Sequence, residues 1–289
     1  MKYVFVVNSF SLKDRTEAFI ERIKEIGKKR KIEYSIEVNS LERSTEDILK
    51  DYKNQECIMM AVGGDGMINR VLNGIYDTKN ILGFIPIGTG NDFYKTNKED
   101  LEQGLNDVDV VKINNKYFVN VVCFGIDADI ANESQIIHNK KIPKSQRYNA
   151  GILYHFFKYK SRPLTVEVEG KTYSDKYTTV VVCNGKYYGG GYKVGTYSSI
   201  VDSKVEVYLV SKMNKFSMAR LIMGMKDAKH EKSKKIIKVS TDKLVITSEK
   251  EVACNMDGEE LKDTRFEIEV IPRGQKVYYD QSLIDEFLR

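Results

Sequence analysis

The chain is predicted to fold as an α/β N-terminal domain with a mainly parallel sheet, followed by an all-β sandwich as C-terminal domain. Three observations lead to this expectation. In roughly the first 110 residues, apolar strand patterns alternate with helical patterns, which is typical of a parallel sheet covered by helices. After about residue 108, short strand-like segments follow one another with turn residues between them. At 289 residues, the chain is long enough for two ordinary domains.

The elements of the first domain follow from the spacing of apolar residues. Tyr3–Val7 is a short apolar run and is predicted to be a buried strand. Apolar residues from Leu12 to Ile26 trace one helical face, and Gly27 is well placed to end that helix. Apolar residues then alternate from Ile32 to Val38, as expected for a second strand. The remaining elements expected here are a helix near Thr45–Tyr52, a strand at Cys57–Val62, a helix at Met67–Tyr76 and a strand at Ile81–Ile87.

The second domain is predicted to begin with a hairpin, because two strand-like segments flank Asn114-Asn115. The boundary is placed near residues 108–113, which gives domains 1–110 and 111–289, and the tail 274–289 is a candidate to pack back on the first domain. The other expected strands are Leu164–Val168, Thr178–Cys183, Val205–Val210, Ile236–Ser240, Leu244–Thr247, Val252–Asn255 and Phe266–Ile271, and the expected helices are Ser145–Lys160, Phe216–Met225 and Ser282–Arg289.

Charge and composition exclude several classes of protein. The net charge of +5 is far below that of a dedicated nucleic-acid binder, so no nucleic-acid partner is expected. Two basic clusters, Lys28–Lys31 and Lys232–Lys235, are interpreted as solvated faces, with contact to an anionic surface as the alternative. The three histidines show neither triad nor metal spacing.

The four cysteines lie dozens of residues apart in apolar segments, which indicates buried thiols in a reducing cytosol rather than a zinc site or disulfides. The apolar start of the chain is too short for a signal peptide. No stretch approaches the roughly 20 apolar residues that span a bilayer. The protein is therefore expected in the cytoplasm, with at most peripheral contact to the inner face of the membrane.

A glycine turn, Gly63-Gly64-Asp65-Gly66, follows the buried-type strand Cys57–Val62 and precedes a helical pattern. A strand, a glycine turn and a helix N-terminus together favour anions, because the helix dipole and unpaired amide N–H groups point at the turn. An aspartate within such a turn is suited to Mg²⁺ carried by a nucleotide. The turn therefore predicts a nucleotide-phosphate site.

Further motifs follow this turn in a fixed order: Asn73-Gly74, Pro86-Ile87-Gly88-Thr89-Gly90-Asn91-Asp92-Phe93, Asn120 with Gly125-Ile126-Asp127-Ala128, Asn184-Gly185 with Gly189-Gly190-Gly191, and Met256-Asp257-Gly258-Glu259. Over roughly residues 1–275 the set resembles the diacylglycerol kinase catalytic family, in particular its soluble bacterial lipid kinases. The resemblance implies ATP bound in a cleft between an α/β domain and a β-sandwich, and transfer of its γ-phosphate to a lipid hydroxyl.

The resemblance also implies roles for individual residues. Asp65 and Asp92 match the acidic pair that positions Mg²⁺, partly through water. Asp257 matches the general base that acts on the acceptor hydroxyl, with Glu259 beside it. The implied nucleotide-binding residues are Asn8, Gly63, Gly64, Asp65, Gly66, Met67, Gly88, Thr89, Gly90, Asn91 and Asp127.

The residue types agree with the chemistry of phosphoryl transfer, which needs neutralised charge and an in-line acceptor more than covalent help. Glycine-loop amides and Mg²⁺ supply the first, and a carboxylate near the acceptor hydroxyl supplies the second. Each acid also has a structural interpretation. Asp92 is suited to cap a helix, Asp127 to a turn or cap, and Asp257-Gly258 to a hairpin turn.

The chain departs from the family pattern near the nucleotide site. Met67 stands where the family has Thr, and a thioether is a poor partner for phosphate. Arg70 stands where the following helix commonly has Glu, which reverses the local charge. The first strand keeps only Asn8 of an Asn-Pro-x-x-Gly turn, and Val201-Asp202-Ser203 replaces a region where Asp-Gly is usual.

The sequence therefore predicts an ATP- and Mg²⁺-dependent lipid kinase whose partner is a lipid at the membrane surface, with diacylglycerol as the expected acceptor. Sphingoid bases and other lipid alcohols stay open as acceptors, and the oligomeric state is undecided, with a homodimer among the options. One alternative is an NAD-kinase-like phosphotransferase, although Gly-Thr-Gly-Asn-Asp-Phe and Asp-Gly-Glu favour the lipid branch. The other alternative is a pseudokinase that binds nucleotide or lipid with weak or no turnover. Met67 and the incomplete Asn-Pro-x-x-Gly turn after the first strand support it.

Overall fold

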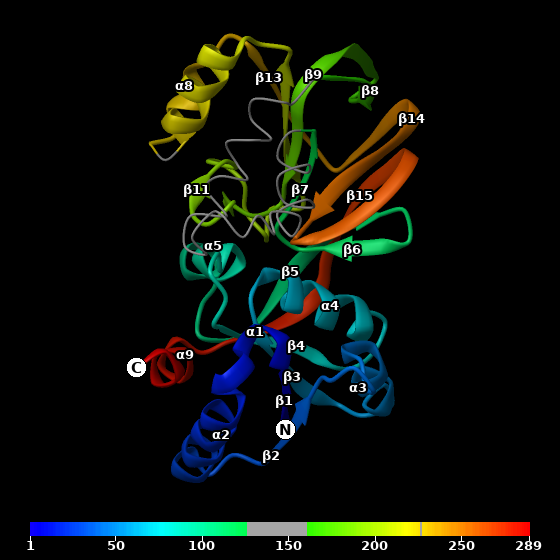
Figure 1. The fold of residues 1–289 in the computed structure, drawn as a ribbon. Coiled ribbons are helices and arrows are strands. Elements are labelled where there is room, and N and C mark those ends of the chain that lie inside the picture. Colours follow the sequence, from blue (N-terminus) through cyan, green and yellow to red (C-terminus); the bar gives the residue numbers. More distant parts are fainter. Residues whose placement is uncertain (126–160, 226) are drawn as a thin grey trace.

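The computed structural model describes residues 1–125, 161–225 and 227–289. Figure 1 shows the N-terminal strands and their helices in one domain and the later antiparallel strands in a second, with β5 and β15 running between them. The first ten elements are β1 (Lys2–Val7), α1 (Ser9–Leu12), the 3-10 helix η1 (Lys13–Arg15), α2 (Thr16–Arg30), β2 (Tyr34–Val38), α3 (Thr45–Asp51), β3 (Cys57–Gly63), α4 (Asp65–Ile75), β4 (Ile81–Pro86) and α5 (Asp92–Asp100).

The later part of the chain is mostly strand. Its described elements are β5 (Gly104–Ile113), β6 (Lys116–Phe118), β7 (Val121–Gly125), β8 (Arg162–Val168), β9 (Lys171–Cys183), β10 (Tyr187–Tyr188), β11 (Tyr192–Lys193), β12 (Val205–Ser211), α8 (Lys215–Met225), the 3-10 helix η2 (Lys229–Lys232), β13 (Ile236–Thr241), β14 (Lys243–Met256), β15 (Glu259–Tyr279) and α9 (Gln281–Leu288). The predicted helix Ser145–Lys160 lies outside the described residues.

The expectation of a mainly parallel sheet holds only for the N-terminal strands. There β2, β1, β3 and β4 lie side by side in parallel, and the end of β15 adds to β4 in parallel through Val277 and Leu82. The other pairings are antiparallel, and thirteen of the described strands form one connected sheet. The sheet as a whole is therefore mixed and mostly antiparallel, because β15 and β5 run from the sandwich into the first domain and join the two sets of strands.

The two larger of the apolar core clusters among the described residues match the two kinds of pattern in the sequence. All seven residues of β3 are buried, as expected for a central strand covered on both faces. The six from Cys57 to Val62 belong to the first core, together with the apolar faces of α2 and α4. The second core lies in the sandwich and is rich in Val and Ile from β7, β8, β9 and β14. All four cysteines are buried thiols.

Several predicted bounds needed correction. The turn at Asn114-Asn115 does join two paired strands, but the second arm stops at Phe118 and β7 pairs elsewhere, with β9 and β14. The sequence offered a helix after Asp92 only as the structural interpretation of that aspartate. The helix α5 is present, and its N-cap is Asn91, with Asp92 as its first residue. β14 runs through both predicted segments between Leu244 and Asn255, with a break in register that the sequence does not mark.

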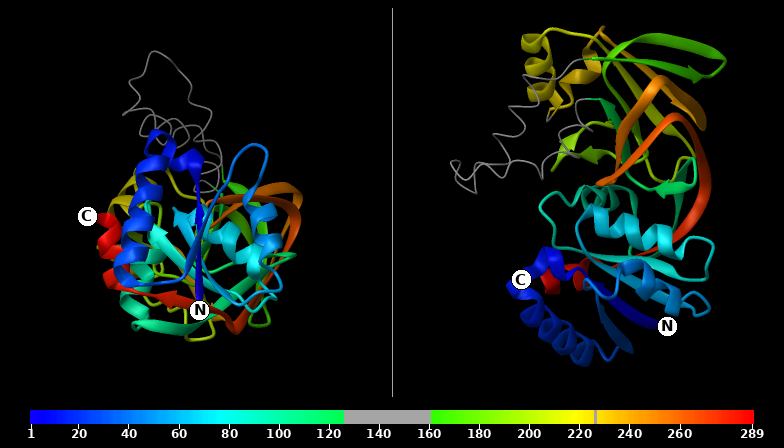
Figure 2. Two further views of the ribbon diagram at one scale, coloured as in Figure 1. Left: turned by 90° about the horizontal axis from the view of Figure 1, so that it is seen from below. Right: turned by 45° about the vertical axis from the view of Figure 1, so that its right-hand side comes forward.

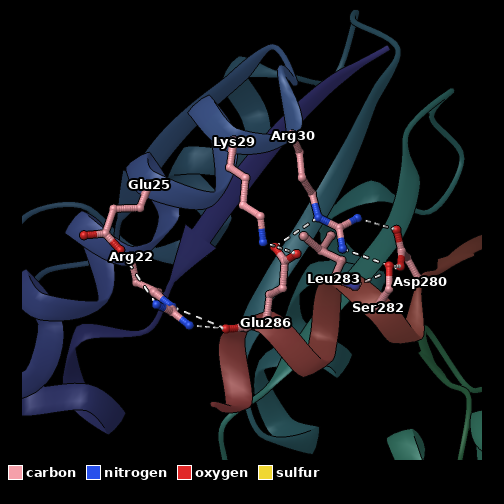
Figure 3. Close-up of polar contacts among 8 residues, drawn as sticks. All are labelled: Arg22, Glu25, Lys29, Arg30, Asp280, Ser282, Leu283 and Glu286. Atoms are coloured by element: carbon pink, nitrogen blue, oxygen red, sulfur yellow. Dashed lines mark hydrogen bonds and ion pairs between the residues drawn. The ribbon is translucent and has the colours of Figure 1, made fainter.

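The C-terminal helix α9 packs against α2 at the far end of the first domain (Figure 3). Phe287 stacks on Phe19 at a centroid distance of 5.4 Å and tilts against Phe5 at 5.8 Å. The guanidinium of Arg30 reaches Asp280 at 3.1 Å and Glu286 at 3.2 Å, and Figure 3 shows Lys29 on the same carboxylate. The C-terminal helix therefore packs on α2 and on the core of the first domain.

No helix among the described residues is long and apolar enough to cross a membrane.

Candidate active site

The first glycine turn lies where β3 meets α4, at the carboxyl end of the parallel strands. β3 ends at Gly63, Gly64 is the N-cap, and Asp65 opens the helix. The amides of Asp65 and Gly66 belong to the first turn of α4, where no intrahelical acceptor exists. This end of the helix therefore presents N–H donors and the positive end of the helix dipole, as the sequence predicted.

The second glycine turn, between β4 and α5, lies directly against the first. The amide of Ile87 donates to the carbonyl of Gly63 at 3.0 Å. A methyl group on Gly88 would lie 2.5 Å from Cα of Gly64, so the two backbones touch at a distance that only glycine allows. Asn91 holds the turn in shape, because its side-chain amide donates to the carbonyls of Pro86 and Gly88 at 2.9 Å each.

Asp65 ties the two turns together. One of its oxygens accepts from the amide of Asp92 at 3.1 Å and the other from the amide of Phe93 at 2.9 Å, so this carboxylate caps α5. Burial raises the pKa of Asp65 above its usual range, and the amide of Phe93 acts in the opposite direction. Asp65 is therefore a structural link between the turns as well as a candidate metal ligand.

Asp92, the first residue of α5, has its carboxylate near Gly90, as Asp65 has. Its Oδ2 accepts from the amide of Gly190 at 2.8 Å, and its Oδ1 lies 3.1 Å from Nζ of Lys95, which also donates to the carbonyl of Gly90 at 2.6 Å. A methyl group on Gly90 would meet Oδ2 of Asp65 at 3.2 Å and Oδ2 of Asp92 at 3.6 Å. Two carboxylates and one ammonium group therefore surround Gly90.

Lys95 was not among the residues predicted from the sequence. Its signal there is the spacing of three from Asp92 within one helix, which brings the two side chains to the same face.

The third part of the site comes from the other domain. Asp257 and Gly258 form the two-residue turn between β14 and β15, and both have positive φ, +48° and +96°. The Asp257 carboxylate points inward and accepts from three amides: those of Val119 at 2.9 Å, Asn120 at 3.2 Å and Val121 at 2.8 Å. Only 5% of Asp257 is exposed. Burial raises its pKa to about 6, against the opposing effect of the amides.

This turn touches the N-terminus of α4. A methyl group on Gly258 would lie 3.3 Å from the amide nitrogen of Gly66, and one on Gly66 would lie 3.3 Å from Oε1 of Glu259. The same oxygen of Glu259 pairs with Nε of Arg70 at 2.9 Å. Three turns that are far apart in the sequence thus meet at the junction of the domains, where the nucleotide cleft was expected.

The hairpin β10–β11 contacts α5 next to this junction. Tyr187 and Lys186 bond to Glu99, and Lys193 reaches Glu99 at 3.1 Å. Asn120, from a predicted motif, donates to the carbonyl of Tyr187 at 2.9 Å. The motif glycines near Gly190 therefore act here through backbone contact with α5.

The remaining predicted residues fall in different places. Asn8 lies beside Gly63, and its side chain accepts from the amide of Ser11 at 3.3 Å, so it caps α1. Thr89 is exposed between the two glycines of its turn. Asp127 lies outside the described residues.

Met67 requires a correction, because neither its side chain nor its amide faces the site. Only 3% of Met67 is exposed, and the side chain belongs to the first core, with its sulfur 3.9 Å from Oγ1 of Thr45. The Met67 amide donates to the carbonyl of Gly64 at 3.0 Å. The departure at this position is therefore a change in core packing.

Comparison with known proteins agrees with this geometry. Residues 2–116 match the family model described as the diacylglycerol kinase catalytic domain, and residues 120–279 match the one described as the YegS C-terminal NAD kinase beta sandwich-like domain. A Staphylococcus aureus (strain MRSA252) protein with the name "Putative lipid kinase" is 28% identical over 239 residues, 78% of each chain.

Solved structures show the same fold. A structure titled as a diacylglycerol kinase from Bacillus anthracis (strain Sterne) superposes with a TM-score of 0.73 at 21% identity and covers 98% of each chain. A second structure from that strain gives a TM-score of 0.74 at 20% identity, covering 98% of this chain and 96% of the other. On the two family matches, which together span nearly all of residues 2–279, the chain belongs to the diacylglycerol kinase catalytic family and is a kinase-type phosphotransferase.

Proposed function

We propose that the protein is an ATP- and Mg²⁺-dependent lipid kinase that transfers the γ-phosphoryl group of ATP to a lipid hydroxyl, with diacylglycerol as acceptor. The observation that carries the proposal is the contact of Gly258 with Gly66. It brings the candidate base of one domain against the phosphate-binding helix end of the other.

The nucleotide phosphates are assigned to the two touching glycine turns. The first-turn amides of α4 donate to phosphate oxygens, and the helix dipole favours their negative charge. Lys95 adds a cation beside Gly90. In this arrangement the carboxylate of Asp65 holds the second turn against the first by accepting from the amides of Asp92 and Phe93.

The acids of the site fit a magnesium ion that arrives with the nucleotide. Among the described residues no group of three or more His, Cys, Asp or Glu side chains is arranged to hold a metal by itself. Mg²⁺ commonly uses one or two carboxylates and takes its other ligands from phosphates and water. Asp65 and Asp92 supply such a pair over Gly90. A magnesium ion bound there neutralises phosphate charge.

Asp257 is assigned as the base. As the acceptor oxygen bonds to the γ-phosphorus and the bond from that phosphorus to the β,γ-bridging oxygen breaks, the hydroxyl proton passes to the carboxylate of Asp257 and ADP leaves. The amides of Val119, Asn120 and Val121 fix the carboxylate in place. Its raised pKa of about 6 brings the group closer to neutral pH and makes it a better base than an exposed aspartate. Glu259 is held beside it by Arg70.

The acceptor is assigned from the family rather than from a pocket. The matching catalytic model is that of diacylglycerol kinases, and the Bacillus anthracis structure is titled as one. Such an acceptor is embedded in a membrane, so the protein is proposed to work in the cytoplasm with peripheral contact to the membrane.

The test is incubation with γ-labelled ATP, Mg²⁺ and a panel of lipids in mixed micelles, with NAD as an additional acceptor. The Asp257→Asn variant is compared with Asp107→Asn, which changes an exposed aspartate elsewhere. We expect labelled phosphatidic acid from wild type and from Asp107→Asn, and a loss of at least about 100-fold in Asp257→Asn. Nucleotide binding without label in any lipid would replace the proposal by a pseudokinase, and label in NAD alone by an NAD-kinase-like enzyme.

A further inference from the structure

The segment 212–235, which contains α8 and η2, combines a concentrated positive charge with exposed apolar side chains. It has eight Lys or Arg and two acidic residues, a net charge of +6. The rest of the chain has 38 basic and 39 acidic residues, a net charge of −1. The net positive charge of the protein therefore comes from this one short segment.

The helix α8 is apolar on two opposite faces. Met218 is 3% exposed, and Leu221 and Met225 pack against a core cluster that contains Val210 and Ile236. These three residues form the inner face and anchor the helix. Such an inner face accounts for the apolar residues that the fold itself requires.

The outer face has no such explanation. Phe216 is 80% exposed and Met223 is 70% exposed. They are seven residues apart, so they lie on one side of the helix, with the exposed Arg220 between them. An outer helix face in a globular protein is normally polar, and a Phe and a Met on it mark a contact surface.

Exposed lysines flank α8 and η2 in the sequence. Lys212 precedes the helix, and Lys232, Lys234 and Lys235 follow it after η2. The two acids of the segment are already paired, Asp227 with Lys229 at 2.7 Å and Glu231 with Lys238 at 2.6 Å. The buried His230 fixes η2 through the carbonyl of Val194 at 2.9 Å. The exposed basic side chains of this segment are therefore left largely without acidic partners from within it.

The other basic cluster, Lys28–Lys31, differs in two ways: two of its charges are paired, and it has no exposed apolar side chains. Lys29 and Arg30 pair with acidic residues of α9, as Figure 3 shows, so their charge serves the docking of the C-terminal helix. The four residues of that cluster are all Lys or Arg, so it contains no aromatic side chain. The structure thus separates two clusters that look alike in the sequence.

We infer that α8 and η2, with the exposed basic residues among 212–225 and 227–235, form the surface with which the protein docks on an anionic phospholipid bilayer. Phe216 and Met223 enter the interface, and the surrounding lysines and Arg220 face the lipid phosphates. The proposed function needs contact with a membrane but does not say which surface makes it. Figures 1 and 2 show α8 at the end of the C-terminal domain opposite α2 and α9, so docking there leaves the first domain clear of the membrane.

The first test is co-sedimentation with vesicles, without nucleotide. Wild type should bind vesicles of equal parts phosphatidylcholine and phosphatidylglycerol, bind phosphatidylcholine alone much less, and lose binding as NaCl is raised. The variant Phe216→Ser/Met223→Ser should bind the anionic vesicles about tenfold less. Its matched control is Leu41→Ser, which removes an 89% exposed leucine from the first domain.

The charge is tested by Lys232→Glu/Lys234→Glu/Lys235→Glu, for which we also expect a loss of tenfold or more, against Lys28→Glu/Lys31→Glu as control. Unchanged vesicle binding in both α8-region variants, or equal losses in the controls, overturns the inference. Binding of wild type to RNA in place of vesicles at the same salt overturns it as well.

Turnover of a short-chain diacylglycerol in solution separates this inference from the proposed function. The α8-region variants should phosphorylate the dissolved acceptor as wild type does, since they leave Asp65 and Asp257 untouched. Vesicle binding without turnover on any lipid would disprove the proposed function and leave the docking surface standing.

Discussion

The carboxylate of Asp257 accepts hydrogen bonds from three consecutive amides, those of residues 119–121, although it belongs to a hairpin turn far along the chain. The turn and the buried carboxylate are compatible, because Asp257 has the positive φ of a turn residue while its side chain accepts from the amides beside it. The sequence presents these as competing interpretations, and the structure shows that one residue is suited to both.

The raised pKa of Asp257 predicts a pH dependence. If Asp257 is the base, kcat/KM should fall by about tenfold per pH unit below its pKa of about 6, because the protonated carboxyl cannot accept the hydroxyl proton. The measurement is a pH–rate profile from pH 5 to 8 with a check that the protein stays folded. A rate that is flat across this range would contradict the assignment.

The same group has an opposite signature in stability. Its pKa of about 6 in the folded protein exceeds the ordinary value of 3.8, so between these values the folded state binds the proton more tightly than the unfolded state. This group alone therefore makes the free energy of unfolding decrease as the pH rises through that window.

Met67 gives a residue-scale prediction that separates packing from binding. Met67→Thr removes buried volume from the first core and should lower the free energy of unfolding by about 2 kcal/mol. Nucleotide affinity should stay within twofold, roughly, because the side chain does not face the site. Denaturant unfolding and nucleotide titration measure the two effects. Met223→Thr, at an exposed position, is the control and should change stability little. A large gain in nucleotide affinity in Met67→Thr would show that the position belongs to the site.

At the scale of elements, the junction of the domains depends on how the hairpin β10–β11 holds α5. Glu99 is the centre of this contact. Burial raises its pKa, but hydrogen bonds from Tyr187, Lys193 and Lys186 outweigh burial and lower the pKa to about 2. The hairpin also brings the amide of Gly190 to Asp92. A change at Glu99 therefore acts on the site through the hairpin.

Glu99→Gln should lower stability at pH 7 by about 1 kcal/mol or less, since Glu99 is partly exposed to solvent. The difference from wild type should shrink as the pH falls from 4.5 toward 2, because the charged form that the three donors stabilise is lost. Thermal unfolding over that pH range measures it, with the exposed Glu102→Gln as control. An equal change in stability in both variants would contradict a stabilising role for the contacts between Glu99 and the hairpin.

On the scale of the whole molecule, the two domains are joined by long strands rather than by a linker. β15 begins at the site, at Glu259, and ends beside β4 in the first domain, where α9 follows. The sandwich and the α/β domain are thus parts of one connected sheet. Any movement between them must bend β5 and β15.

The C-terminal helix gives the prediction at this scale. Phe287→Ala should lower the free energy of unfolding by about 3 kcal/mol, because a 7% exposed ring that packs on Phe5 and Phe19 is lost from the first core. Leu288→Ala, at a 50% exposed neighbour, should cost well under about 1 kcal/mol. Denaturant unfolding of both variants is the measurement. Equal stability of the two would mean that α9 is not part of the first domain.

The sequence by itself determined the alternation of strands and longer helices up to β4 in the first domain, the change to antiparallel strands after it, and the glycine turns, because these follow from local periodicity and backbone freedom. It named Asp65, Asp92 and Asp257 through their motifs. It could not show that α9 completes the first domain, that Lys95 enters the site, or that Met67 belongs to the core. Nor could it separate the basic cluster that pairs with α9 from the one around Phe216. Those facts depend on contacts between residues far apart in the chain, which only the folded structure brings within hydrogen-bond or packing distance.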